Sequence, residues 1–309
     1  MSFTNNIKTE LSKKSGSKIE YIAELSGFLR NNSVYTKNKI CFSTENISVA
    51  KKIYIMLKET YDIKVEIKIQ NKNTFKKRNN YLIVINKKVP LILTDLCMTD
   101  DKLKRLPQVK EYIIDSEDSI RAYLRGAFLA RGSINDPKTS RYHMEIITNY
   151  KEEGLVLQRL LNNFYLNSKI IPREKGYMIY LKEAEKIGDF IRIINANNAV
   201  MYFEDIRIYR DHKNMTNRLN NCEQANTDKV VETANKQIED INLIINELGI
   251  DFIEEKLKEV MEFRLKYPDA SLQELSEIIT IETNNSITKS GLSHRFKKIE
   301  NIAKKIKET

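Results

Sequence analysis

The stretch LRGAFLARGS, residues 124–133, has the apolar spacing of an α-helix but carries Gly126 in its middle. Glycine inside a helix costs about 1 kcal/mol relative to alanine, so we expect a compensating contact. Gly126, Ala127 and Ala130 recur on neighbouring turns, and small residues on one helix face allow a second backbone to approach closely. We therefore interpret this helix as one side of a tight helix–helix contact.

A second stretch, LSGFLRNNS at 25–33, repeats the pattern 99 positions earlier. After each copy the sequence predicts a strand, an amphipathic helix, a two-stranded hairpin and a closing helix. This repetition predicts an α+β fold with two related lobes, each an αββαββα unit, packed side by side. The expected interface between the lobes consists of small residues from both copies: Ser26, Gly27, Gly126, Ala127 and Ala130. Two ordinary core helices with incidental glycines are the simpler alternative.

The rest of the chain divides by composition. We expect a first lobe at 1–98, a polar linker at 99–118, a second lobe at 119–210, a connecting segment and helix at 211–250, and an all-α domain at 251–309. Hydrophobic residues make up 41% and charged residues 30%, as in soluble globular proteins. No apolar run reaches the roughly 18 residues of a membrane span, and the first residues lack a signal-peptide pattern, so we expect no membrane partner.

The C-terminal region reads as three helices. FIEEKLKEVMEFRLKYP (252–268) precedes DASLQELSEIIT (269–280), in which Ser271 and Glu274 have the spacing of a capping box. The last segment, TKSGLSHRFKKIENIAKKIKET (288–309), has an apolar stripe and a basic opposite face. This order predicts a helix-turn-helix, from Ser271 to Ile306, although its turn is longer than usual. A charged helix that merely caps a bundle is the alternative.

The charge distribution favours a nucleic-acid partner. Residues 289–309 hold seven Lys and Arg against two Asp and Glu, whereas residues 211–288 hold eight against sixteen. Because cations gather on surfaces that bind phosphates, we predict that the last helix binds double-stranded DNA. The expected base contacts are Ser290, Ser293, His294 and Arg295, and the expected phosphate contacts are Lys289, Lys297 and Lys298. We also consider accessory contacts from a basic hairpin tip, at Lys76, Lys77 and Arg78, although a solvated tip is the commoner case.

The two glycine-bearing stretches resemble the paired LAGLIDADG motifs of homing endonucleases. The resemblance implies that the two helices form the lobe interface and that an acidic residue near the end of each motif holds a divalent metal over DNA. Here those positions are Asn32 and Arg131. Mg²⁺ needs hard oxygen ligands, and two-metal cleavage needs them on both sides. We therefore expect no catalytic residue, no metal, no cofactor and no small-molecule substrate; a residual endonuclease is the alternative.

Several long segments resemble the WhiA proteins of Gram-positive bacteria. They are RAYLRGAFLARGS (121–133), IRIYRDHKNMTNRLNNCEQAN (206–226), QIEDI (237–241), YPDASLQELSEI (267–278) and TKSGLSHRFKKIE (288–300). The resemblance implies a degenerate LAGLIDADG domain joined to a helix-turn-helix, and a DNA-binding regulator of transcription. It further implies a role in cell division, in chromosome segregation and, where the organism sporulates, in sporulation. We then expect a cytoplasmic, nucleoid-associated protein; a scaffold that docks RNA polymerase or another regulator is the alternative.

Overall fold

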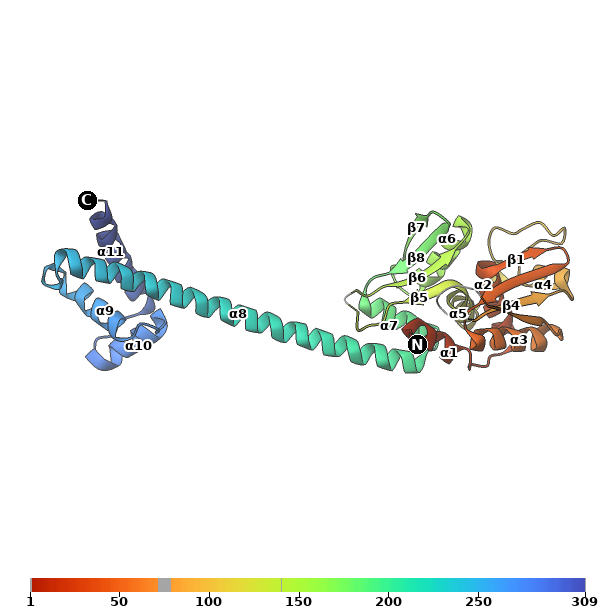
Figure 1. Ribbon diagram of the computed structural model, residues 1–309, viewed down its shortest axis with the longest axis horizontal. Coiled ribbons are helices and arrows are strands. Elements are labelled where there is room, and N and C mark those ends of the chain that lie inside the picture. The colour runs from red at the N-terminus through yellow and green to blue at the C-terminus, as the bar shows by residue number, and fades with distance from the viewer. Residues whose placement is uncertain (1, 72–78, 140, 309) are drawn as a thin grey trace. The chain divides into compact units, whose positions relative to one another are not determined.

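The computed structural model describes residues 2–71, 79–139 and 141–308 (Figure 1). The chain forms two compact units that divide after Arg210. The first unit contains two four-stranded antiparallel sheets, and the second contains helices. None of the described helices is long and apolar enough to cross a membrane.

The two lobes of the first unit repeat the same order of elements. The first lobe consists of α2 (Lys18–Asn32), β1 (Ser33–Thr36), β2 (Lys39–Thr44), α3 (Ile47–Tyr61), β3 (Glu66–Asn71), β4 (Asn79–Ile85) and α4 (Val89–Asp95). The second consists of α5 (Glu117–Arg131), β5 (Gly132–Ile134), β6 (Met144–Thr148), α6 (Lys151–Asn163), β7 (Lys169–Arg173), β8 (Gly176–Leu181) and α7 (Ala184–Ile193). The sheet orders, β1-β2-β4-β3 and β5-β6-β8-β7, are equivalent. The predicted pair of αββαββα units is confirmed.

Helices α2 and α5 pack against each other between the two sheets (Figure 1). Helix α2 begins with a capping box, in which the Ser17 side chain accepts from the Glu20 N–H and the Glu20 carboxylate accepts from the Ser17 N–H. Helix α5 is capped by Ser116, whose hydroxyl accepts from the Ser119 N–H. Each helix ends directly at the first strand of its sheet, so the ends of both motifs lie where the lobes meet.

Two parts of the first unit were not anticipated from the sequence. Helix α1 (Phe3–Leu11) precedes the first repeat and buries Phe3, Ile7 and Leu11 in the common core. The segment 99–118, predicted as a polar linker, does join α4 to α5. It also contains the short 3-10 helix η1 (Glu111–Ile113) and contributes buried side chains to the core, Val109, Ile113 and Ile114. These apolar residues are spaced without regular period, which is why composition alone suggested an exposed segment.

The second unit is built on the C-terminal part of α8 (Asn197–Leu248), a helix that begins in the first unit. After it come η2 (Ile250–Phe252), α9 (Glu255–Lys266), α10 (Leu272–Thr283) and α11 (Lys289–Lys307). The sequence predicted helix only towards the end of 211–250, whereas the whole of 211–248 is helical. The core of this unit joins α8 to the three following helices through Ile241, Ile244, Leu257, Val260, Met261, Leu275, Ile279, Leu292, Phe296, Ile299 and Ala303.

Two neighbouring residues of α9 have the opposite burial to what their polarity would suggest. Leu265 is exposed, whereas Arg264 is buried. The Arg264 guanidinium donates to Gln237 Oε1 at 3.0 Å and to the Ala270 carbonyl at 2.6 Å, and it lies over the Phe296 ring. These acceptors compensate for its burial, which a pattern of apolar residues cannot reveal.

Candidate nucleic-acid interface

The outward face of α11 is basic and exposed. Leu292, Phe296 and Ile299 point into the core. Six of the seven residues predicted to contact DNA are exposed on the remaining surface: Lys289, Ser290, Ser293, His294, Lys297 and Lys298. The first turn of α11 contains no acidic residue, so its positive helix end is not neutralised from within the helix. This face can therefore accept a polyanion.

Arg295, the seventh predicted contact, has partners within the unit. Its Nη1 lies 3.2 Å from Glu259 Oε2 and 3.3 Å from the Lys256 carbonyl, both in α9. Its side chain is 26% exposed. The guanidinium therefore holds α11 against α9 and does not extend from the basic face with the other six.

The connection between α10 and α11 comprises residues 284–288, with a helix cap at each end. Helix α10 begins with the predicted capping box of Ser271 and Glu274. It ends at Asn284, which has a positive φ of 54°, a conformation that asparagine tolerates better than most residues. Thr288 then caps α11, because its hydroxyl accepts from the Gly291 N–H at 3.1 Å. The longer turn is thus compatible with a helix-turn-helix arrangement.

In the first unit, two glycines allow α2 and α5 to touch. A Cβ on Gly27 would lie 2.2 Å from the Tyr123 carbonyl oxygen, and one on Gly126 would lie 2.0 Å from the Glu24 carbonyl oxygen. The Ala127 nitrogen is also close to Gly27, at 3.2 Å from the same hypothetical Cβ. Such distances exclude any side chain at either glycine. The contact is therefore backbone against backbone.

The other two residues of the predicted lobe interface lie elsewhere. The Ser26 hydroxyl donates to the Leu96 carbonyl at 2.8 Å, which ties α2 to the end of α4 within the first lobe. Ala130 is partly buried and lines a surface groove between the lobes. The structure thus brings Gly27, Gly126 and Ala127 together, and places Ser26 and Ala130 beside the contact.

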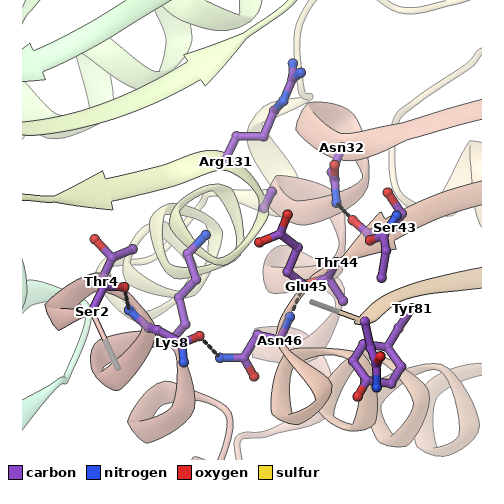
Figure 2. A pocket seen from close by; sticks show the side chains of 14 residues that line it. Ser2, Thr4, Lys8, Asn32, Ser43, Thr44, Glu45, Asn46, Tyr81 and Arg131 are labelled. Atoms are coloured by element: carbon purple, nitrogen blue, oxygen red, sulfur yellow. Dashed lines mark hydrogen bonds between the residues drawn. The ribbon is translucent and has the colours of Figure 1, made fainter. Parts of the chain in front are cut away.

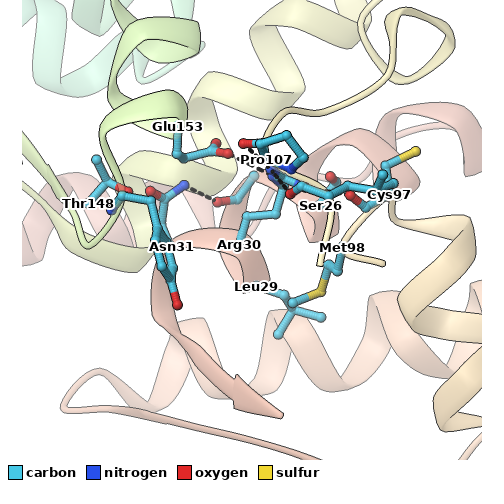
Figure 3. Close-up of polar contacts among 12 residues, drawn as sticks. Ser26, Leu29, Arg30, Asn31, Cys97, Met98, Pro107, Thr148 and Glu153 are labelled. Carbon is cyan, nitrogen blue, oxygen red and sulfur yellow. Dashed lines mark hydrogen bonds and ion pairs between the residues drawn. The ribbon is translucent and has the colours of Figure 1, made fainter. Parts of the chain in front are cut away.

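Two buried ionic networks cross the lobe interface, and the sequence reading missed both. The Glu24 carboxylate lies 2.8 Å from Lys52 Nζ and 2.8 Å from Arg125 Nε of the other lobe. In the second network, Arg30 Nε lies 2.7 Å from Glu153 Oε2, and Arg30 also donates to the Cys97 carbonyl (Figure 3). In the sequence, the only indication of these networks is the presence of charged residues on otherwise apolar helix faces.

Asn32 and Arg131 both line a groove of about 690 Å³ where the lobes meet (Figure 2). The Asn32 amide donates to the Ser43 carbonyl at 3.0 Å, and Arg131 donates to Asn149 Oδ1 at 2.5 Å. Lys8 also lines the groove, and burial lowers its pKa to about 8 although Glu45 opposes the shift. The remaining lining residues are hydroxyl, amide or small: Ser2, Thr4, Asn5, Ser43, Thr44, Asn46, Asn79, Asn80, Tyr81 and Ala130.

This groove has the wrong donors for a catalytic divalent metal. Glu45 is the one carboxylate among its described lining residues, and Lys8 and Arg131 add two cations. Within the described ranges, no group of three or more His, Cys, Asp or Glu side chains could hold a metal ion. Two nearby carboxylates are engaged elsewhere: Glu24 in its ion pairs, and Asp136 in accepting from the Lys138 N–H at 2.9 Å. Since Mg²⁺ prefers several oxygen ligands, the side chains present do not fit it.

Lys76, Lys77 and Arg78, the predicted accessory contacts, lie outside the described residues.

Helices α2 and α5 touch at their glycines between two four-stranded sheets, and this arrangement defines a LAGLIDADG-like domain. Helices α9 to α11 define a helix-turn-helix domain. Family models agree over nearly the whole chain. The WhiA N-terminal LAGLIDADG-like domain matches residues 18–98, the WhiA LAGLIDADG-like domain matches 120–213, and the WhiA C-terminal HTH domain matches 216–303. The chain belongs to the WhiA family.

Individual relatives agree with this assignment. The "Probable cell division protein WhiA" of Bacillus cereus (strain AH187) and that of Bacillus anthracis (strain CDC 684 / NRRL 3495) are each 43% identical to this chain over 311 residues, covering 99% of it and 98% of the relative. The full-length DUF199/WhiA crystal structure from "Thermatoga maritima" is 25% identical, with a TM-score of 0.60 and 99% of both chains covered. The N-terminal LAGLIDADG domain of DUF199/WhiA, 24% identical with a TM-score of 0.51, covers 63% of this chain and 90% of that one and shares the fold.

Proposed function

We propose that this chain is a sequence-specific, non-catalytic protein that binds double-stranded DNA and regulates transcription. Its setting would be bacterial cell division and chromosome segregation, and sporulation in organisms that sporulate, within the cytoplasm on the nucleoid. The observation that carries the proposal is the exposed basic face of α11 in a helix-turn-helix domain. The name of the Bacillus relatives, a cell division protein, supports the cellular setting.

In this proposal α11 is the helix that enters the major groove. Helix-turn-helix proteins place the N-terminal residues of the second helix against base edges, while lysines contact phosphates. Ser290, Ser293 and His294 would therefore face bases. Lys289, Lys297 and Lys298 would bind phosphates, and Arg295 would hold the helix in position through Glu259.

Salt-dependent binding to a fluorescent duplex of random sequence tests the phosphate contacts. Each phosphate contact contributes about 0.9 to the slope of log K against log salt. The double variant Lys297→Ala/Lys298→Ala should lower that slope by about 2 and weaken binding at every salt concentration. Lys51→Ala/Lys58→Ala removes the same charge from exposed positions of α3 and serves as the matched control. If both double variants lost the same DNA affinity and the same salt slope, the assignment of α11 as the phosphate-binding helix would be contradicted.

The lack of catalysis is proposed from the groove that holds Asn32 and Arg131. Its single carboxylate and two cations oppose the binding of the divalent ions that two-metal phosphodiester cleavage requires. Supercoiled plasmid incubated with the protein and Mg²⁺ or Mn²⁺ should stay intact. Nicking above that of a mock preparation would establish a residual endonuclease instead.

A helix-turn-helix can also serve as a docking module for proteins, RNA polymerase among them. That competing function predicts weak duplex binding by the wild type together with stable co-purification of polymerase. The basic charge of the α11 face favours DNA as the primary partner, because phosphates attract cations without requiring a complementary protein surface.

A further inference from the structure

Residues 211–229 of α8 form a helix with no intramolecular cover. Every one of them is exposed. Most helices in proteins derive their stability from burying one face, and asparagine is a poorer helix former than alanine. Yet this segment contains five asparagines: Asn214, Asn217, Asn220, Asn221 and Asn226. Helix stability does not explain them, and no described core contact does.

Three of these asparagines share one face with an arginine. Asn214, Asn217, Arg218 and Asn221 have the spacing i, i+3, i+4 and i+7, which places them on adjacent turns of the same side. No Asp or Glu occurs between Lys213 and Asn221. We call this set of four residues the amide face. The exposed apolar residues of the segment, Met215 and Leu219, border the amide face beside Asn214 and Arg218.

The chemistry of the amide face matches base edges in the major groove of DNA. An asparagine amide can donate and accept at once, which suits the N6 and N7 atoms of adenine, and arginine suits the O6 and N7 atoms of guanine. The major groove admits an exposed α-helix, as it does for continuous basic helices that lie across it. A protein partner would instead favour an apolar centre, which this face lacks.

The carboxylates that flank the amide face do not cover it. Asp211 lies one turn before Asn214 and lines the same shallow hollow as Asn214 and Arg218, whereas Glu223 lies on the opposite side of the helix. Asp228 accepts from the Gln224 amide at 2.8 Å. No hydrogen bond or ion pair within the described residues engages the side chains of Asn217, Arg218 or Asn221, so these groups are free to meet a ligand.

We propose that the amide face of α8 is a second DNA-reading element, separate from α11, that recognises base edges through Asn214, Asn217, Arg218 and Asn221. This inference rests on the proposed DNA-binding function. It predicts that the recognised sequence contains two blocks, one read by α11 and one by α8.

Selection of bound duplexes from a random-sequence library tests the inference with the full-length chain. The wild type should yield two sequence blocks. Asn217→Ala/Asn221→Ala should lose one of them and bind the wild-type sequence about tenfold more weakly or worse. The salt slope should stay unchanged because neutral amides release no counterions. Alanine favours the helix, so lost binding cannot be attributed to unfolding, and circular dichroism verifies this.

Thr216→Ala/Asn220→Ala, on the opposite side of the helix, is the matched control and should retain both blocks.

If Lys297→Ala/Lys298→Ala weakens binding while Asn217→Ala/Asn221→Ala keeps the wild-type sequence and affinity, the inference fails and the proposed function stands. If the wild type binds no duplex, both fail. If the asparagine variant changes the sedimenting mass but not DNA binding, the face binds a second copy of the chain and the inference is wrong.

Discussion

Gly27 of α2 and Gly126 of α5 stand 99 positions apart and meet across a single helix contact, each leaving room for a carbonyl oxygen of the other helix. The pair explains why both helices tolerate glycine. The close approach brings α2 and α5 together along their contact. It also places the ends of both glycine-bearing motifs at the groove lined by Asn32 and Arg131.

Gly126→Ala should destabilise the first unit by about 3 kcal/mol or more, because the new Cβ would meet the Glu24 carbonyl oxygen at 2.0 Å. Urea unfolding followed by circular dichroism measures the loss. Gly291→Ala in α11 is the control: its Cβ would find ordinary contacts at 3.4 Å and beyond, so stability should be unchanged or slightly higher. A neutral Gly126→Ala would show that the backbones do not touch.

Glu24→Gln should cost about 3 to 5 kcal/mol, because it removes the carboxylate in close contact with the buried Lys52 and Arg125 and leaves only the more distant Glu20, 3.9 Å from Arg125. Burial already lowers the pKa of Lys52, which Glu24 partly offsets. The control is Glu117→Gln, which breaks the partly exposed pair with Arg121 and should cost less than about 1 kcal/mol. Equal costs in the two variants would mean that the Glu24 network contributes no more than a surface pair. Chemical denaturation at neutral pH gives both values.

Lys8 should make stability rise with pH above about 8. Its folded pKa is about 8 against an ordinary value of 10.5, so the unfolded chain binds more protons between these values and the free energy of unfolding increases with pH. Lys8→Met removes this partly buried charge. It should therefore stabilise the protein at pH 7, and by a smaller amount as the pH approaches 10. Lys13→Met, at an exposed position, provides the baseline. A stability difference that is constant with pH would contradict the lowered pKa.

Asn32→Asp/Arg131→Asp should create a divalent-cation site in the groove. The substitutions add two carboxylates near Glu45 and remove one cation. Mn²⁺ binding, followed by the electron paramagnetic resonance signal of the free ion, should then be detectable in the variant and absent from the wild type. Asn32→Ala/Arg131→Ala removes the same native side chains without adding ligands. If the aspartate variant binds no more Mn²⁺ than the alanine variant, the two positions do not converge on a common point.

Much of the fold could be predicted, because the same order of elements occurs twice in the sequence and each element depends on local residue patterns. The repeated glycines, the alternating strands and the Ser271 capping box all act over a few residues. The buried networks could not be predicted, because Arg30 and Glu153 are far apart in the chain and only folding joins them. The burial of Arg264 could not be predicted for the same reason: its acceptors, Gln237 and the Ala270 carbonyl, lie outside α9.

The candidate interface was predictable in part. The alternation of apolar and basic positions in α11 fixes which residues are exposed. It does not reveal that Glu259 engages Arg295, because that partner belongs to another helix. The helical structure of the exposed middle of α8 could not be predicted, because its polar composition is typical of loops as well as of solvated helices.

Fusing two halves into one polypeptide allows equivalent positions to diverge. Glu24 and Tyr123 occupy the same place in the two repeats. The first is a carboxylate between two cations, and the second is a phenol that donates to Glu153. A dimer of identical subunits would carry one residue type at both places, and a mutation would alter both at once. Joining the halves in one chain removes that restriction, so a surface spanning the two halves has a polarity.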